Sequence, residues 1–201
     1  RRASAAAKAS AASLMKAVAQ FATPNQSEWD ARVYRLDLLP DPTLQILTGS
    51  VIVDATVTTG PLVTLDLDLY DNMTVDSVHA GGAPASFVHT ADILTITLDR
   101  PYLAGEAVSV QVWYQGTPNA GVFGPIFSFD AFNGRPLIWT LSEPFGARAW
   151  WPCKDVPEDK ADSVEVRVTV PSGMTTVSNG TLVESSDNAV VATTRWKERY
   201  P

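Results

Sequence analysis

The sequence has few of the residues on which many small protein sites depend. Its 201 residues contain one cysteine, which excludes an intrachain disulfide, and two histidines, too few to complete a three-ligand catalytic metal site. No apolar run approaches the roughly 18 residues that a membrane helix needs, so no membrane span is expected. The net charge is −7 and no Lys/Arg cluster offsets it, so nucleic acid is not expected as a partner.

What remains is an ordinary globular composition, with 45% hydrophobic and 18% charged residues, enough for one large domain with or without an appendage. Residues 3–22 carry the only helix signal, an Ala/Lys-rich stretch with one apolar stripe. We expect residues 1–24 to form a helical leader or mobile N-terminal segment and residues 25–201 to form a β-domain. The basic, Ala/Ser-rich start is compatible with the remainder of a cleaved export signal, but it does not fix the compartment.

From residue 32 the hydrophobic period changes to two. Valines alternate with other residues at 108–112 and at 164–170, which predicts strands with one face buried. Similar runs lie at 51–57, 65–69 and 93–98. Turn signals separate the runs, among them Asn179-Gly180, which is typical of a two-residue hairpin. The spacing predicts an all-β fold, and the absence of strand–helix alternation excludes a Rossmann-type domain.

The alternation stops between Gly116 and Arg135. This stretch holds four glycines, two prolines and four phenylalanines, which predicts a long loop. Aromatic side chains in such a loop need a cover, and a second domain would supply one.

The most unusual stretch is residues 140–155, Thr-Leu-Ser-Glu-Pro-Phe-Gly-Ala-Arg-Ala-Trp-Trp-Pro-Cys-Lys-Asp. It gathers two tryptophans, the only cysteine, an arginine and two carboxylates in a connection between two β-like segments, where sites concentrate. The order Thr-x-x-Glu-Pro-x-x-Ala-Arg, then Trp-Pro-Cys-x-Asp-x-Pro, resembles the end of the N-terminal β-domain in the aminopeptidase N family of zinc metallopeptidases (gluzincins), which includes leukotriene-A hydrolase. Shorter segments extend the resemblance over roughly residues 30–201, namely 30–38, 49–53, 65–67, 103–106 and 112–118.

The strand spacing predicts an antiparallel sheet or sandwich, and with the resemblance we expect an antiparallel, saddle-like β-sandwich domain. The short N-terminal helix is expected from the pattern at residues 3–22, which lies outside the resemblance. The resemblance also implies that Glu143 and Leu141 bind substrate, because the family places a carboxylate or amide at the Glu143 position to hold the free α-amine of a peptide. A carboxylate suits this task because the amine is cationic near neutral pH. Taken alone, Glu143 before a proline would be interpreted as an ordinary turn carboxylate.

Four further residues of the stretch are expected to support the Glu143 loop, namely Arg148, Asp155, Trp150 and Trp151. Cys153 is interpreted as a small buried hydrophobic residue rather than as a reactive thiol. The chain departs from the common family pattern at Leu141, where many members have glutamine, and at Lys154 and Val156, which replace an aromatic residue and a glutamate. The change at Leu141 removes one polar group from the expected substrate site.

The family binds zinc through a His-Glu-x-x-His helix, whereas His79 and His89 lie ten residues apart in β-like surroundings. We therefore expect no catalytic residue, no metal ligand and no hydrolysis from this chain alone. Zinc is expected in a downstream catalytic domain, which would be one partner of this domain, the N-terminus of a peptide substrate being the other.

Two other functions remain open. A stand-alone β-sandwich module that binds carbohydrate or protein would use the aromatic stretch Gly116–Arg135, and a family member that has lost its catalytic residues would only bind. A downstream His-Glu-x-x-His motif would exclude the stand-alone module.

Overall fold

The computed structural model describes residues 25–201, except 119, 122–123, 144 and 200. The helix expected over residues 3–22 and the leader expected over 1–24 lie outside the described residues. Within the described part the chain is built of strands and two short 3-10 helices, η1 (Gln26–Glu28) and η2 (Ala147–Ala149). In this part no helix has the length and apolar character needed to cross a membrane.

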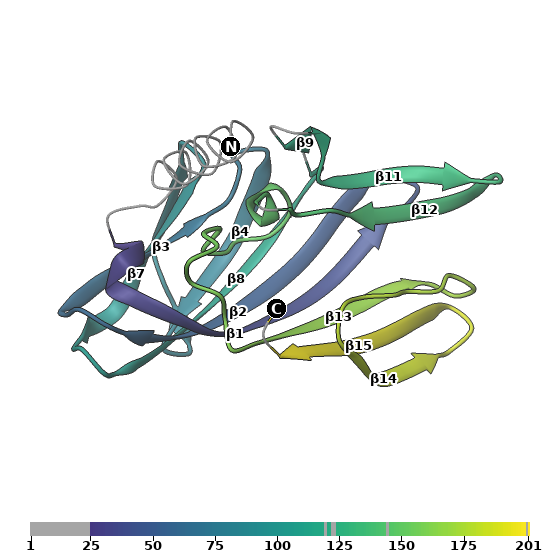
Figure 1. Ribbon diagram of the computed structural model, residues 1–201. Coiled ribbons are helices and arrows are strands. Elements are labelled where there is room, and N and C mark those ends of the chain that lie inside the picture. Colours follow the sequence, from purple (N-terminus) through teal and green to yellow (C-terminus); the bar gives the residue numbers. More distant parts are fainter. Residues whose placement is uncertain (1–24, 119, 122–123, 144, 200) are drawn as a thin grey trace, which may run out of the picture.

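The largest sheet has the strand order β14-β15-β13-β1-β2-β8-β4-β5 (Figure 1). Its strands are β1 (Trp29–Asp41), β2 (Ile46–Val57), β4 (Met73–Ala80), β5 (Ala83–Pro84), β8 (Ala107–Gly116), β13 (Ser163–Pro171), β14 (Thr181–Asp187) and β15 (Val191–Arg199). A three-stranded sheet has the order β3 (Leu62–Asp68), β7 (Ile93–Tyr102) and β6 (Phe87–Thr90). The remaining strands of the described part form two two-stranded antiparallel sheets. One pairs β9 (Ala120–Gly121) with β10 (Gly124–Pro125), and the other pairs β11 (Phe127–Phe132) with β12 (Arg135–Thr140).

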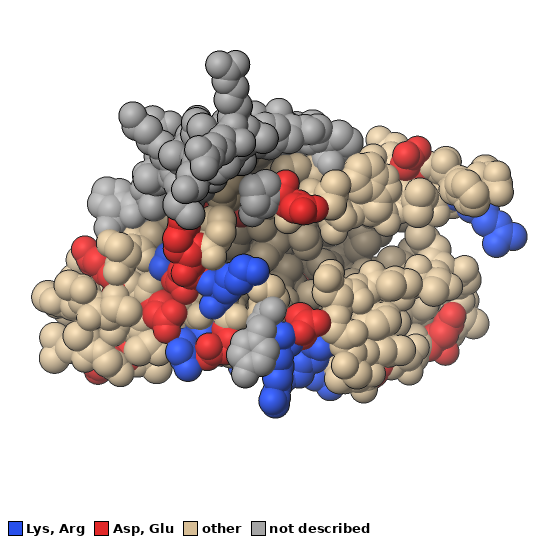
Figure 2. All heavy atoms as spheres, viewed as in Figure 1, with Lys and Arg blue, Asp and Glu red and all other residues tan. Residues whose placement is uncertain are grey.

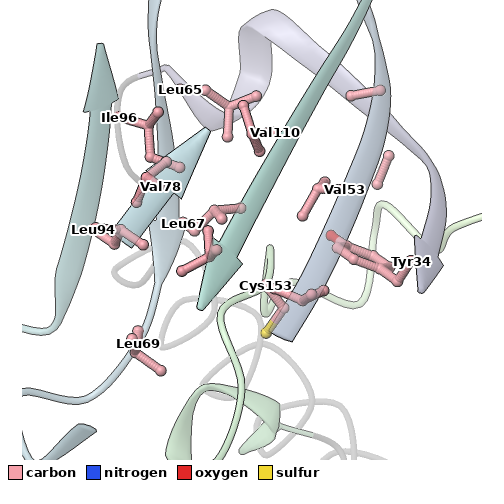
Figure 3. Close-up of a cluster of buried hydrophobic side chains, with 14 of the residues drawn as sticks. Tyr34, Val53, Leu65, Leu67, Leu69, Val78, Leu94, Ile96, Val110 and Cys153 are labelled. Atoms are coloured by element: carbon pink, nitrogen blue, oxygen red, sulfur yellow. The ribbon is translucent and has the colours of Figure 1, made fainter. Parts of the chain in front are cut away.

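The core lies between the large sheet and the three-stranded sheet. In β8, Val108, Val110, Val112 and Tyr114 are buried while the residues between them are half-buried or exposed, as the period of two predicts. Figure 3 shows side chains of the two sheets meeting, with those of the three-stranded sheet (Leu65, Leu67, Leu94, Ile96) facing those of the large sheet (Val53, Val78, Val110). The all-β fold predicted from the alternation is confirmed.

Strands β13, β14 and β15 form one end of the large sheet, which we call the wing. Its pairing with β1 is parallel, with Leu36 opposite Val166 and Leu38 opposite Val168, so the expected antiparallel arrangement has one exception. The valines of β13 are only half-buried from 164 to 168, because their face opens into a groove instead of packing on a second sheet. The opposite face carries ion pairs, among them Arg167–Asp37 at 3.3 Å.

Two sequence predictions about connections are wrong. Phe127–Phe132 is not part of a loop, because it pairs with β12 in a hairpin that projects from the body (Figure 1). The turn is Asn133-Gly134, with φ of 51° and 73°, which a two-residue hairpin turn with positive φ at both positions requires.

Asn179-Gly180 does not form a hairpin turn either, because β13 and β14 each pair with β15 and not with each other. The glycine is needed for a different reason. A Cβ at Gly180 would lie 2.2 Å from the carbonyl oxygen of Lys197, so only glycine permits the chain to pass β15 this closely.

Candidate functional site

The stretch 141–155 leaves the hairpin at β12, passes through η2 and returns along the edge of the three-stranded sheet. Cys153 and Asp68 exchange backbone hydrogen bonds of 2.7 and 3.1 Å, which add the stretch to β3 as a short bridge. The backbone amide of Tyr70 donates to the carbonyl oxygen of Arg148 at 3.0 Å. The stretch is thereby tied to the core at two points.

A buried ion network lies at the base of this stretch. Arg148 contacts Asp155 (Nε to Oδ2, 2.9 Å) and Asp68 (Nη1 to Oδ1, 3.1 Å), and the three residues are 6%, 8% and 0% exposed. Asp68 also accepts hydrogen bonds from the side chain of Gln26 at 3.0 Å and from the backbone amide of Asp155 at 2.9 Å. Charges this deeply buried are tolerated because each is paired and hydrogen-bonded.

The pKa values in this network show the competition between burial and pairing. Burial raises the pKa of the Asp68 carboxyl, and this effect outweighs the opposing influence of Arg148 and of the hydrogen bonds that Asp68 accepts. For Arg148, burial lowers the pKa but the neighbouring carboxylates Asp68 and Asp155 raise it by more, so the guanidinium stays charged. The network therefore depends on the charge of Arg148.

Asp155 connects this network to the loop that carries Glu143. Its carboxylate accepts the backbone amide of Gly146 at 3.0 and 3.3 Å, a buried interaction. Gly146 has a φ of 125°, and a Cβ there would lie 1.9 Å from the Cδ1 atom of Ile126. Arg148 and Asp155, expected from the resemblance to support the loop, are thus in direct contact beneath it.

The two tryptophans belong to a chain of aromatic contacts. Trp150 lies against Phe127 of the hairpin, with ring centroids 5.8 Å apart, and against Trp151 at 5.9 Å. Trp151 meets the ring of Tyr34 edge-on at 4.9 Å. These contacts join the hairpin, the stretch 141–155 and β1 into one packed unit.

Lys154 has a role that the sequence did not reveal. Its ammonium donates to the carbonyl oxygen of Trp29 at 2.8 Å, forms an ion pair with Asp159 and lies 4.7 Å from the centroid of the Trp29 ring. Its side chain is 6% exposed. The departure from the family's aromatic residue was visible in the sequence, but the partner 125 residues away was not.

Glu143 and Leu141 lie in the open, Leu141 at 56% exposed. Both line a groove of about 1710 Å³ between the hairpin and the wing, which Figure 2 shows as a hollow in the surface. Much of the groove lining is apolar, including Leu36, Leu38, Phe127, Ile138, Trp150, Trp151 and the valines 164, 166, 168 and 170. Within the described residues the Glu143 carboxylate has no hydrogen bond or ion pair.

The remaining candidates lie elsewhere. Both histidines are on strands, His79 packed edge-on against Trp113 at 4.9 Å and His89 bonded to the carbonyl oxygen of Leu69 at 2.9 Å. Cys153 is buried, and burial raises the pKa of its thiol well above the usual range, as expected for a packed rather than a reactive cysteine (Figure 3). In residues 25–201, outside the gaps named above, no three His, Cys, Asp or Glu side chains gather so that they could hold a metal ion.

Comparison with known proteins agrees with this fold. Residues 30–201 match the family model of the Peptidase M1 N-terminal domain. No curated protein matches the chain. The M1 zinc metallopeptidase from Deinococcus radiodurans is 30% identical with a TM-score of 0.74, over 86% of this chain and 39% of that chain.

Two further solved structures are glutamate-to-alanine variants with bound ligands. An M1 zinc metallopeptidase from Deinococcus radiodurans bound to a Tyr-Ser-Ala substrate is 31% identical, with a TM-score of 0.75 over 86% of this chain and 39% of that chain. A two-domain M1 zinc metallopeptidase bound to L-tryptophan is 32% identical, with a TM-score of 0.75 over 86% of this chain and 40% of that chain. The chain thus spans about 40% of the length of these structures. The chain belongs to the M1 family of zinc metallopeptidases, and its residues 30–201 correspond to the N-terminal domain of that family.

Proposed function

We propose that residues 25–201 are the substrate-recognition domain of a zinc-dependent aminopeptidase, which removes N-terminal residues from peptides, and that Glu143 binds the α-ammonium group of the substrate. The observation that carries the proposal is the exposure of the Glu143 carboxylate and its lack of a partner among the described residues. This carboxylate lies at the edge of an apolar groove. The flanking chain, in contrast, is fixed by the bond from the Leu141 amide to the Ile126 carbonyl oxygen (2.7 Å) and by the Gly146–Asp155 contact.

The chemistry of the pair is favourable. A free α-amine has a pKa near 8 and is cationic at neutral pH. A carboxylate accepts hydrogen bonds from it with charge assistance, which makes such contacts short and roughly twice as strong as neutral ones. A peptide with a blocked N-terminus offers neither the charge nor three donors, so the contact selects for free N-termini.

The apolar walls of the groove favour a second domain as the partner of this one. It exposes apolar side chains on both walls, the hairpin and the wing, and one of the similar structures is described as a two-domain enzyme. Domain interfaces within one chain typically bury about 600–1,500 Å². The zinc and the catalytic groups would belong to that domain, because the described residues offer no set of ligands for a metal ion.

The test is a Glu143→Ala variant of the whole enzyme. Loss of one partner of a desolvated charged contact costs about 2–5 kcal/mol, which corresponds to a fall of roughly thirtyfold or more in kcat/KM for substrates with a free α-amine. Glu143→Gln should be affected less, because the amide oxygen still accepts a hydrogen bond. N-acetylated substrates should lose their disadvantage relative to free ones in the alanine variant.

Glu158→Ala is the matched control, since Glu158 is also exposed but does not line the groove. It should leave kcat/KM unchanged. A Glu143→Ala enzyme with unchanged kcat/KM would refute the role of Glu143.

A further inference from the structure

Ser142, next to Glu143, makes a side-chain contact that crosses the loop. The indole Nε1–H of Trp150 donates to the Ser142 Oγ at 3.2 Å. Within the described residues this is the one hydrogen bond between side chains that joins the segment 141–143 to the rest of the domain. The other fixed points of the loop are the backbone amides of Leu141 and Gly146.

The donor in this contact is held in place by packing. The Trp150 ring is half-buried between Phe127 and Trp151, and Trp151 is in turn fixed against Tyr34. An indole can only donate through its nitrogen, and a serine hydroxyl readily accepts, so the roles in the pair are determined. Ser142 itself is exposed and has no other hydrogen-bond partner among the described residues, so without Trp150 its side chain would be free to rotate.

We propose that Trp150 and Ser142 form a positioning pair, in which the fixed indole holds the backbone at Ser142 and so directs the Glu143 carboxylate into the groove. The proposal rests on the proposed function, because the direction of Glu143 matters only if its carboxylate binds substrate. All three side chains line the same groove. A short exposed segment that is held by one side-chain contact can change its conformation when that contact is lost. Displacement of a binding group by about 1 Å is enough to weaken catalysis.

The experiment uses the whole enzyme and a peptide substrate with a free α-amine. Ser142→Ala removes the acceptor, and Trp150→Phe removes the donor while keeping an aromatic ring in the packed cluster. Each should lower kcat/KM by roughly three- to tenfold, the effect of one net hydrogen bond, and the double variant should be no worse than either alone. Ser142→Thr keeps the hydroxyl and should stay within about twofold of the native enzyme.

The decisive measurement is the same Ser142→Ala change in a Glu143→Ala background. A positioning pair acts through Glu143, so Ser142→Ala should there have no further effect on kcat/KM. A merely structural role would instead lower the melting temperature and act regardless of Glu143. If Glu143→Ala weakens catalysis but Ser142→Ala and Trp150→Phe do not, or if their effects persist without Glu143, the positioning inference is overturned and the proposed function stands. If Glu143→Ala itself has no effect, the proposed function fails, and the positioning inference fails with it.

Discussion

Replacement of Arg148 by methionine is the sharpest test of how the site is supported. The change leaves the length of the side chain nearly intact but removes the positive charge between Asp68 and Asp155. Both carboxylates are less than 10% exposed and would remain buried without a cation. Breaking a buried pair in this way typically costs about 3–5 kcal/mol. Native domains are stable by only about 5–15 kcal/mol, so at least about a fifth of the total would be lost.

The assay is unfolding of the 201-residue chain by urea and by heat, each followed by tryptophan fluorescence, since the chain has six tryptophans. For a domain of this size the expected loss corresponds to a fall in Tm of roughly 6–20 °C. Arg167→Met is the matched control, because its ion pair with Asp37 is exposed, with side chains at 51% and 42%. Exposed pairs contribute about 0–1 kcal/mol, so this variant should differ little from the native chain.

The pH dependence gives a second, independent check. Burial already raises the pKa of Asp68, and loss of Arg148 removes the charge that opposes this rise. A carboxyl whose pKa is higher in the folded state than in the unfolded state contributes stability at low pH that is lost as the pH rises through the folded-state value. The difference in stability between the native chain and Arg148→Met should therefore shrink as the pH falls from 8 to 5. A loss equal to that of Arg167→Met, or one that does not change with pH, would refute the argument.

Three further predictions concern single contacts. Gly146→Ala should lower the free energy of unfolding by about 1–3 kcal/mol in urea titrations, because its Cβ would meet the Ile126 side chain at 1.9 Å. Lys154→Met should cost a similar amount by the same assay, because it leaves the carboxylate of Asp159 without its cation. The hydrogen bond from Lys197 lowers the pKa of Glu165 and outweighs burial, which acts in the opposite direction. This carboxylate therefore contributes stability above its unfolded-state pKa, and the contribution is lost as the pH falls through the folded-state pKa. Chains with Glu165→Gln should therefore differ from the native chain in urea midpoint at pH 7 and much less at pH 3.

The sequence predicted the central strands well because their alternation reflects burial on a single face. In β8 the predicted inward residues are the buried ones. The composition of the stretch 140–155 and the family resemblance both pointed to it as the candidate site. The order of the strands in the large sheet was not predictable in the same way. Alternation in β13 shows that its valines share a face, but it does not show which strand β13 pairs with or in which direction. The parallel pairing with β1 depends on the edge of β1 that is not occupied by β2.

The supporting contacts of the site escaped prediction for a related reason. The side chain of Gln26 bonds to Asp68 and that of Lys154 to the Trp29 backbone, across 42 and 125 positions of sequence. No local pattern marks such pairs, because each residue alone has the propensities of a surface position. The hairpin was missed although its signal was present. Asn133-Gly134 is a favoured two-residue turn, but the surrounding glycines and phenylalanines suggested a loop.

The position of Glu143 limits what can cover the groove. When a second domain or a substrate closes over apolar walls, water leaves, and a carboxylate without a counter-charge becomes costly by several kcal/mol. Whatever covers Glu143 must therefore bring a cation or strong donors, and two sources are possible, the α-ammonium of a substrate and a basic side chain of the second domain. These differ in one measurable respect. If the cation belongs to the second domain, Glu143→Ala lowers the Tm of the substrate-free enzyme. If the cation belongs to the substrate, the Tm of the substrate-free enzyme hardly changes, while the stabilisation by a bound peptide with a free N-terminus is reduced.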